Sequence, residues 1–143
     1  MRRFATMIVL VLVTAASGAA ADKKDSLEQL KARADSAAGK HEIELATEIA
    51  ERQLKATDEA YSAGNVDQAQ VALTDVVDYG VRAAKEATNT GKRMKQTEIA
   101  LRKIADKLDG IGKSVDVDSR PAVVDAVKKL EAARNDLLFR MFK

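Results

Sequence analysis

The sequence contains no cysteine and no tryptophan, and only one proline and one histidine among its 143 residues. Without cysteine the chain has no disulfide, no c-type haem attachment and no lipoprotein attachment site. Aromatic residues make up 3% of the chain, which suits an aromatic-rich ligand pocket poorly. The single proline leaves room for long helices, because proline interrupts a helix most strongly. We therefore expect a core of alanine, leucine and valine that is held by helix packing alone.

The first 21 residues have the pattern of a secretory signal peptide. Arg2 and Arg3 supply the positive charge, residues 7–16 form an apolar run, and Ala19 and Ala21 fill the small-residue positions before a cleavage site. We expect cleavage after Ala21, a periplasmic or secreted protein, and a mature single domain of residues 22–143. The apolar run is too short to cross a bilayer, which takes about 20 residues, so we expect no transmembrane span in the mature form. The alternative is that the peptide is retained as an anchor.

The charge is balanced overall but not along the chain. Without Arg2 and Arg3, 22 basic and 22 acidic side chains remain, so the net charge gives no reason to expect nucleic-acid binding. Residues 22–91 hold 9 basic and 14 acidic side chains, whereas residues 92–143 hold 13 basic and 8 acidic ones. One interpretation is that the two halves face each other across antiparallel helices. The alternative is that the basic half meets an anionic partner such as a cell-envelope surface.

The longest regular pattern is a seven-residue repeat of apolar or small side chains between Val66 and Ile111. One register holds Val66, Leu73, Gly80, Ala87, Met94, Leu101 and Leu108, and the register three residues on holds Ala69, Val76, Ala83, Thr90, Thr97, Ile104 and Ile111. This spacing predicts a coiled-coil-like helix over residues 66–111, with the stripe buried. Asn89–Gly91 is the one weak point, but the unbroken phase favours a continuous helix.

Two further helices are expected on either side of this repeat. Ser26 and Gln29 have the spacing of a capping box, which predicts a helix over residues 26–63. Pro121 suits the first turn of a helix over residues 120–142. The predicted fold class is therefore all-α, an antiparallel bundle of three long helices. The alternative is a compact four-helix bundle that is kinked at Gly39 or at Asn89–Gly91.

A bundle of three long helices would be thin, and it would leave apolar side chains uncovered. We expect these to include Leu45, Ile49 and Leu54 on the first helix, and Phe139 and Phe142, which lie off the apolar stripe of the last one. Exposed apolar surface usually marks an interface. The sequence therefore predicts that the protein self-associates or holds a protein partner.

The run from Ala60 to Ala69, followed by Leu73, resembles the inter-helix turn of a tetratricopeptide repeat. Gly64 and Asn65 stand where that family has its turn, and Ala69 stands where it has a small residue in the second helix. The resemblance covers about residues 53–87, and no second copy follows at a period of 34. It implies a helical hairpin around this turn, rather than membership of a stacked repeat array.

No combination of residues makes a catalytic, cofactor or metal site in the sequence. His41 is the only histidine, and Glu44 and Glu48 are the only side chains that could share a metal with it on one helix face. The bundle-metal pattern has the opposite order and occurs twice. Gly112-Lys113-Ser114 lacks the first glycine of a phosphate-binding loop, because position 107 is lysine.

Three functions remain open from the sequence. The first is an exported, non-enzymatic helical protein that acts through protein–protein contacts as a scaffold, adaptor or chaperone-like protein. The second is a binder of the cell-envelope surface that uses the basic half, Lys92–Lys143. The third is a bundle that binds a small ligand or a metal, with His41 as its only handle.

Overall fold

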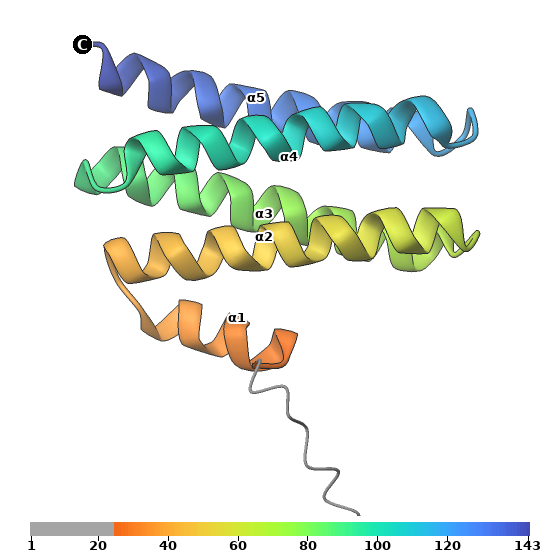
Figure 1. Cartoon of the computed structure of the whole chain (residues 1–143), viewed down its shortest axis with the longest axis horizontal. Helices are drawn as coiled ribbons and strands as arrows, with labels where there is room; N and C mark the ends of the chain where they lie inside the picture. The colour runs from red at the N-terminus through yellow and green to blue at the C-terminus, as the bar shows by residue number, and fades with distance from the viewer. Residues whose placement is uncertain (1–24) are drawn as a thin grey trace, which may run out of the picture.

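The computed structural model describes residues 25–143, and these form five α-helices without any strand (Figure 1). The helices are α1 (Leu27–Ser36), α2 (Lys40–Ser62), α3 (Val66–Thr90), α4 (Met94–Ser114) and α5 (Arg120–Met141). The all-α prediction is confirmed. The predicted signal peptide, residues 1–21, lies outside the described residues, so its prediction stays untested.

The helices form two stacked hairpins with a short helix beneath them (Figure 1). In one hairpin α2 packs against α3, and in the other α4 packs against α5. Contacts of α5 with α3 and of α4 with both α2 and α3 join the hairpins into a four-helix bundle, and α1 covers the outer side of α2. We call α1–α3 the acidic layer and α4 with α5 the basic layer, after the charges of the sequence halves that form them.

The predicted helix over residues 26–63 is wrong, because the chain turns back between α1 and α2. Ser26 and Gln29 form the expected capping box at the start of α1. The helix then ends at Ser36, and Gly39 has φ +61° and ψ −134°, a conformation that is essentially limited to glycine. Gly39 therefore marks a reversal of the chain.

The predicted continuous helix over residues 66–111 is also wrong. Gly91 adopts the left-handed conformation that ends a helix, with φ +70°, and its N–H donates to the carbonyl of Ala87. The seven-residue phase passes through this break because α3 and α4 both turn the same stripe toward one core. A constant phase shows which face is buried, and it does not show whether the helix continues.

The burial predicted from the repeat is confirmed. Leu73, Val76, Leu101 and Ile104 are each at most 5% exposed. Together with Leu108, Ile111, Val123, Ala126 and Leu130 they belong to one cluster between the two hairpins. The core is therefore made of aliphatic side chains from four helices, as the low aromatic content requires.

The apolar face of α2 is covered within the chain, so the predicted thin three-helix arrangement is wrong. Leu45 and Ile49 are buried against Leu30 and Ala34 of α1. Because α1 folds back, it covers a face that a continuous helix over residues 26–63 would have left bare. The structure has the compact four-helix core of the alternative interpretation, with α1 added to it.

Ion pairs fasten α1 to the rest of the acidic layer. The Nζ atom of Lys31 lies 2.8 Å from an oxygen of Asp75, which also accepts a hydrogen bond from Gln53 of α2 at 2.8 Å. Arg82 of α3 donates to Asp35 and to the carbonyl oxygen of Ala34, each at 2.8 Å. Arg82 also donates to Glu42 of α2 at 2.8 Å. These contacts tie three helices together at the side chain of one arginine.

The turn between α2 and α3, which resembles that of a tetratricopeptide repeat, joins two antiparallel helices. Gly64 has φ +78° between α2 and α3, and Ala69 is fully buried one turn into α3. This agrees with the helical hairpin that the resemblance implies.

Candidate functional site

Exposed apolar side chains gather on the basic layer. Among the described residues six large apolar side chains are exposed: Val66, Val71, Val117, Val124, Phe139 and Phe142. Four of these six belong to α4, α5 or the connection between them, and this is also the half with 13 basic and 8 acidic side chains. The coincidence of apolar exposure with excess positive charge makes this layer the candidate functional surface.

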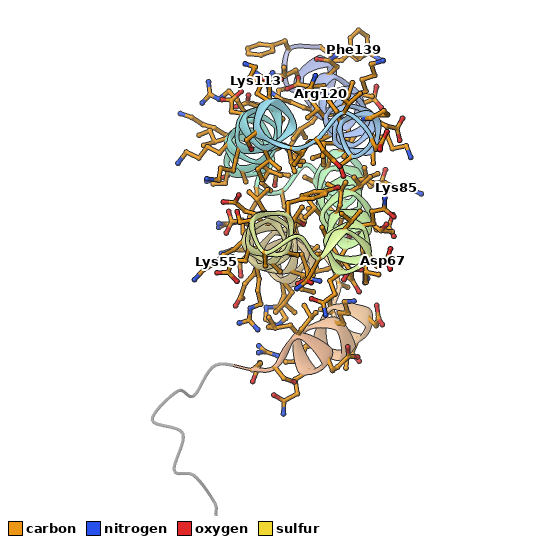
Figure 2. All side chains as sticks on the ribbon, turned by 90° about the vertical axis from the view of Figure 1, so that its right-hand side faces the viewer. Lys55, Asp67, Lys85, Lys113, Arg120 and Phe139 are labelled. Carbon is orange, nitrogen blue, oxygen red and sulfur yellow. The ribbon has the colours of Figure 1, made fainter. Side chains whose placement is uncertain are left out.

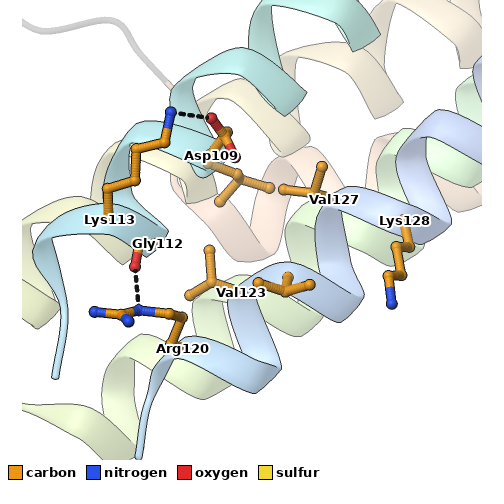
Figure 3. A pocket seen from close by; sticks show the side chains of 9 residues that line it. Asp109, Gly112, Lys113, Arg120, Val123, Val127 and Lys128 are labelled. Carbon is orange, nitrogen blue, oxygen red and sulfur yellow. Dashed lines mark hydrogen bonds and ion pairs between the residues drawn. The ribbon is translucent and has the colours of Figure 1, made fainter. Parts of the chain in front are cut away.

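The clearest hollow in the basic layer is a groove between the end of α4 and the start of α5 (Figure 3). We call it the α4–α5 groove. It has a volume of about 480 Å³ and is lined by Leu108, Asp109, Gly112, Lys113, Arg120, Val123, Val124, Val127 and Lys128. Its floor is therefore aliphatic, and its polar lining holds three cations and one carboxylate.

Gly112 lets the two helices approach each other at the floor of the groove. A Cβ atom on this glycine would lie only 3.2 Å from Cγ1 of Val123. The carbonyl oxygen of Gly112 accepts a hydrogen bond at 3.1 Å from Nε of Arg120, which ties the start of α5 to the end of α4 (Figure 3). Close packing at Gly112 and the contacts of Arg120 with main-chain oxygens thus hold α4 and α5 together at the groove.

Some of the charged side chains that line the groove are already paired with an opposite charge, and others are not. Nζ of Lys113 lies 2.8 Å from Asp109, and this hydrogen bond raises the pKa of Lys113 above its ordinary value. Lys128 takes part in no ion pair within the described residues, and Arg120 makes its contacts with main-chain oxygens. Two positive charges are therefore available to an anionic ligand.

A second feature of the basic layer is an exposed aromatic pair at the opposite end of α5. Phe139 and Phe142 are 70% and 81% exposed. Nζ of Lys143 lies 5.8 Å from the ring centroid of Phe139, within the range of a cation–π contact. The prediction that these two phenylalanines lie off the buried stripe is confirmed.

The two glutamates that could share a metal ion with His41 are paired with arginines instead. His41 is exposed on α2, while Glu44 lies 3.3 Å from Arg93 and Glu48 lies 3.6 Å from Arg52. Across residues 25–143 no group of three or more histidine, aspartate or glutamate side chains is placed to hold a metal ion.

Buried charge in the basic layer is structural. Glu98 is 8% exposed and accepts a hydrogen bond at 2.8 Å from Nε of Arg134, which also lies 3.2 Å from Glu131. The hydrogen bond to Glu98 holds the pKa of Arg134 above its ordinary value. This pair fixes α5 against α4 and leaves neither group free for chemistry.

The groove itself was not predicted from the sequence. Val123 is buried and Val127 partly buried on the apolar stripe of α5, whereas Val124 is 42% exposed beside them. The only hint was the adjacent pair Val123-Val124, because a helix cannot bury two neighbouring side chains equally well against one partner.

None of the described helices is long and apolar enough to span a membrane. Comparison of the chain with known protein families, curated proteins and solved structures found no match.

Proposed function

We propose that the protein is an exported, non-enzymatic binding protein, an adaptor or scaffold, whose α4–α5 groove receives an apolar and acidic segment of a protein partner. One observation carries the proposal. Val124 is 42% exposed over an aliphatic floor, with the cations Arg120 and Lys128 at its edges.

The size and lining of the groove suit a peptide segment. Its volume of about 480 Å³ falls within the usual range of ligand sites, and its floor is apolar, as such sites are. An amphipathic helix binds a groove of this kind through apolar side chains three, four and seven residues apart. The cations would select acidic neighbours of those anchors and speed association, more than add affinity.

Binding is a better assignment than catalysis for this groove. A catalytic site needs a nucleophile or a base within reach of a bound substrate. Asp109 is the only acidic or nucleophilic side chain in the lining, and Lys113 already neutralises it at 2.8 Å. Export rests on the pattern of residues 1–21 and is part of the proposal.

The proposal is tested by affinity purification from an envelope extract. Val124→Asp places a negative charge beside Arg120 and Lys128, where it would repel an acidic partner. Val124 is exposed and does not belong to the core, so the substitution leaves the core intact. Val71→Asp is the matched control, because Val71 is 68% exposed on α3 of the acidic layer.

A partner bound in the groove is retained by the wild-type protein and by Val71→Asp, is lost with Val124→Asp, and elutes with salt. Retention of every bound protein by Val124→Asp would contradict the proposal.

A further inference from the structure

We propose that the protein docks on an anionic lipid surface, with Phe139 and Phe142 seated at the boundary between headgroups and acyl chains. The site is the end of the bundle where α5 ends and α4 begins, and we call it the aromatic–basic end. It consists of Lys95, Phe139, Arg140, Phe142 and Lys143. It is distinct from the α4–α5 groove, so it goes beyond the function proposed above.

The two phenylalanines are not needed by the core. Leu137 and Met141 of the same turns face inward, where they pack with Ile43, Ala87 and Met94. Phe139 lies in the last turn of α5 and Phe142 is the residue at its C-cap, and neither belongs to that cluster. Figure 2 shows Phe139 at the top of the molecule, pointing away from the other helices. These side chains therefore project outward as a pair.

Cations from two segments lie at the same end of the bundle as this pair. Met94 and Met141 pack on one cluster, which brings the start of α4 next to the end of α5. Lys95 follows Met94, and Arg140 and Lys143 flank Met141. Nζ of Lys92, by contrast, is turned toward Gly39 in the connection between α1 and α2. Apart from the cation–π contact of Lys143, none of Lys95, Arg140 and Lys143 has an ion-pair partner within residues 25–143. Their charge is available to an anionic surface.

The carboxylates nearest this end do not cancel that charge. Glu44 is bound by Arg93 at 3.3 Å, and Glu86 accepts a hydrogen bond at 3.3 Å from the main-chain N–H of Gly39. Asp136 lies one turn before Arg140 on α5 and is the one exposed carboxylate of that turn. Glu86 lies on the side of Gly39 and Lys92, so Lys95, Arg140 and Lys143 face Asp136 as the nearest exposed carboxylate and leave a positive excess.

An anionic bilayer fits this combination better than a protein does. In proteins that bind a membrane surface, phenylalanine side chains enter the boundary between headgroups and acyl chains. Lysine and arginine beside them contact anionic headgroups through flexible side chains. Stable attachment takes two signals, an apolar insertion and a basic patch. The aromatic–basic end supplies both at one place.

The first test is sedimentation with vesicles of phosphatidylcholine alone and of equal parts phosphatidylcholine and phosphatidylglycerol. All variants carry the same N-terminus, so differences between them report the substituted residues. Phe139→Ala with Phe142→Ala should lower binding to the anionic vesicles at least about tenfold, given the transfer free energy of a phenylalanine side chain. Arg140→Gln with Lys143→Gln should also weaken binding and reduce its dependence on salt.

Matched controls come from the acidic layer. Val66→Ala with Val71→Ala removes two exposed apolar side chains, and Lys55→Gln with Lys85→Gln removes two exposed lysines. Both double variants should bind anionic vesicles as the wild type does. Val124→Asp should do so as well, which separates a failure of this proposal from a failure of the groove proposal.

The second test measures the fluorescence of a tryptophan at the position that is proposed to enter the membrane. The chain has no tryptophan, so Phe139→Trp introduces a single tryptophan whose fluorescence can be excited separately from that of the two tyrosines. Its emission should shift to the blue with anionic vesicles and be quenched by brominated acyl chains, whereas Val71→Trp should show neither change.

Three outcomes would overturn the proposal. They are equal binding to both vesicle types, binding that the alanine variants leave unchanged, and dimerisation of the protein that requires Phe139 and Phe142.

Discussion

Gly80 of α3 lies directly against Leu130 of α5, in the middle of the contact between the two hairpins. A Cβ atom at Gly80 would come 2.7 Å from Cδ2 of Leu130 and 3.4 Å from Cδ2 of Leu101. Leu130 is fully buried, so its side chain has little room to move aside. The absence of a side chain at Gly80 therefore sets how closely the acidic and basic layers approach.

The first prediction is that Gly80→Ala destabilises the fold. Alanine gains about 1 kcal/mol over glycine inside a helix, but overpacking a core costs about 1–3 kcal/mol, so we expect a net loss of roughly 1 kcal/mol in urea unfolding. Gly110 is the control, because a Cβ there meets no atom within 4 Å. Gly110→Ala should stabilise by about 0.5–1 kcal/mol. Equal stabilisation by both substitutions would show that the helices are not in close contact at Gly80.

The second prediction concerns the core between the hairpins. Leu101 is 2% exposed, so Leu101→Ala should lower the free energy of unfolding by about 2–5 kcal/mol. Val71→Ala, on the exposed face of α3, should change it by no more than about 0.5 kcal/mol. A Leu101→Ala effect as small as that of the control would place the stripe at the surface.

The sequence predicted the buried stripe of α3 and α4, but it was wrong on where the helices end and on the face of α2 that α1 covers. The stripe through Leu73 and Leu101 was visible because burial on one helix face imposes a period close to 3.6. The reversals at Gly39 and Gly91 depend on tertiary contacts that compete with continued helix. A glycine alone does not decide between a helix that continues and one that ends.

The candidate site was predictable only in part. Phe139 and Phe142 could be placed at the surface because they fall off the stripe of α5. The α4–α5 groove could not, because it requires the close approach of Gly112 to Val123, which joins residues on two helices. Such a contact leaves no periodic signal in either segment.

The third prediction is that Arg82→Met weakens the packing of α1 against α2 and α3. The substitution removes the hydrogen bonds to Asp35, to Glu42 and to the main chain of Ala34. Amide hydrogen exchange should speed up in α1 while α4 and α5 stay protected. Arg102→Met removes an exposed arginine of α4 and should leave exchange in α1 unchanged. Unaltered protection of α1 in Arg82→Met would mean that apolar contacts alone hold it.

The fourth prediction is a pH dependence that comes from Lys31. Its hydrogen bond to Asp75 raises the pKa of Lys31 above the ordinary value of 10.5. The stabilisation is therefore complete below that ordinary pKa and is lost as the pH rises through the higher pKa of the folded state. Lys31→Met should cost about 1 kcal/mol at neutral pH, and the difference from wild type should shrink only in strong alkali.

Lys55→Met is the control for Lys31, because Lys55 is 81% exposed and lies 3.9 Å from Glu59. It should change the stability by no more than about 0.5 kcal/mol at any pH. A Lys31 effect that vanished near neutral pH would rule out the assigned ion pair.

The central claim is that the α4–α5 groove is the surface that meets a protein partner, and photo-crosslinking in cells tests it most directly. A photoreactive amino acid replaces Val124 in one strain and Val71 in another, since both side chains are exposed but only Val124 lies in the groove. We predict a discrete adduct from position 124 that disappears when Lys128→Glu reverses a charge of the groove, with no such adduct from position 71. Adducts that are the same from both positions, or that persist with Lys128→Glu, would contradict the claim.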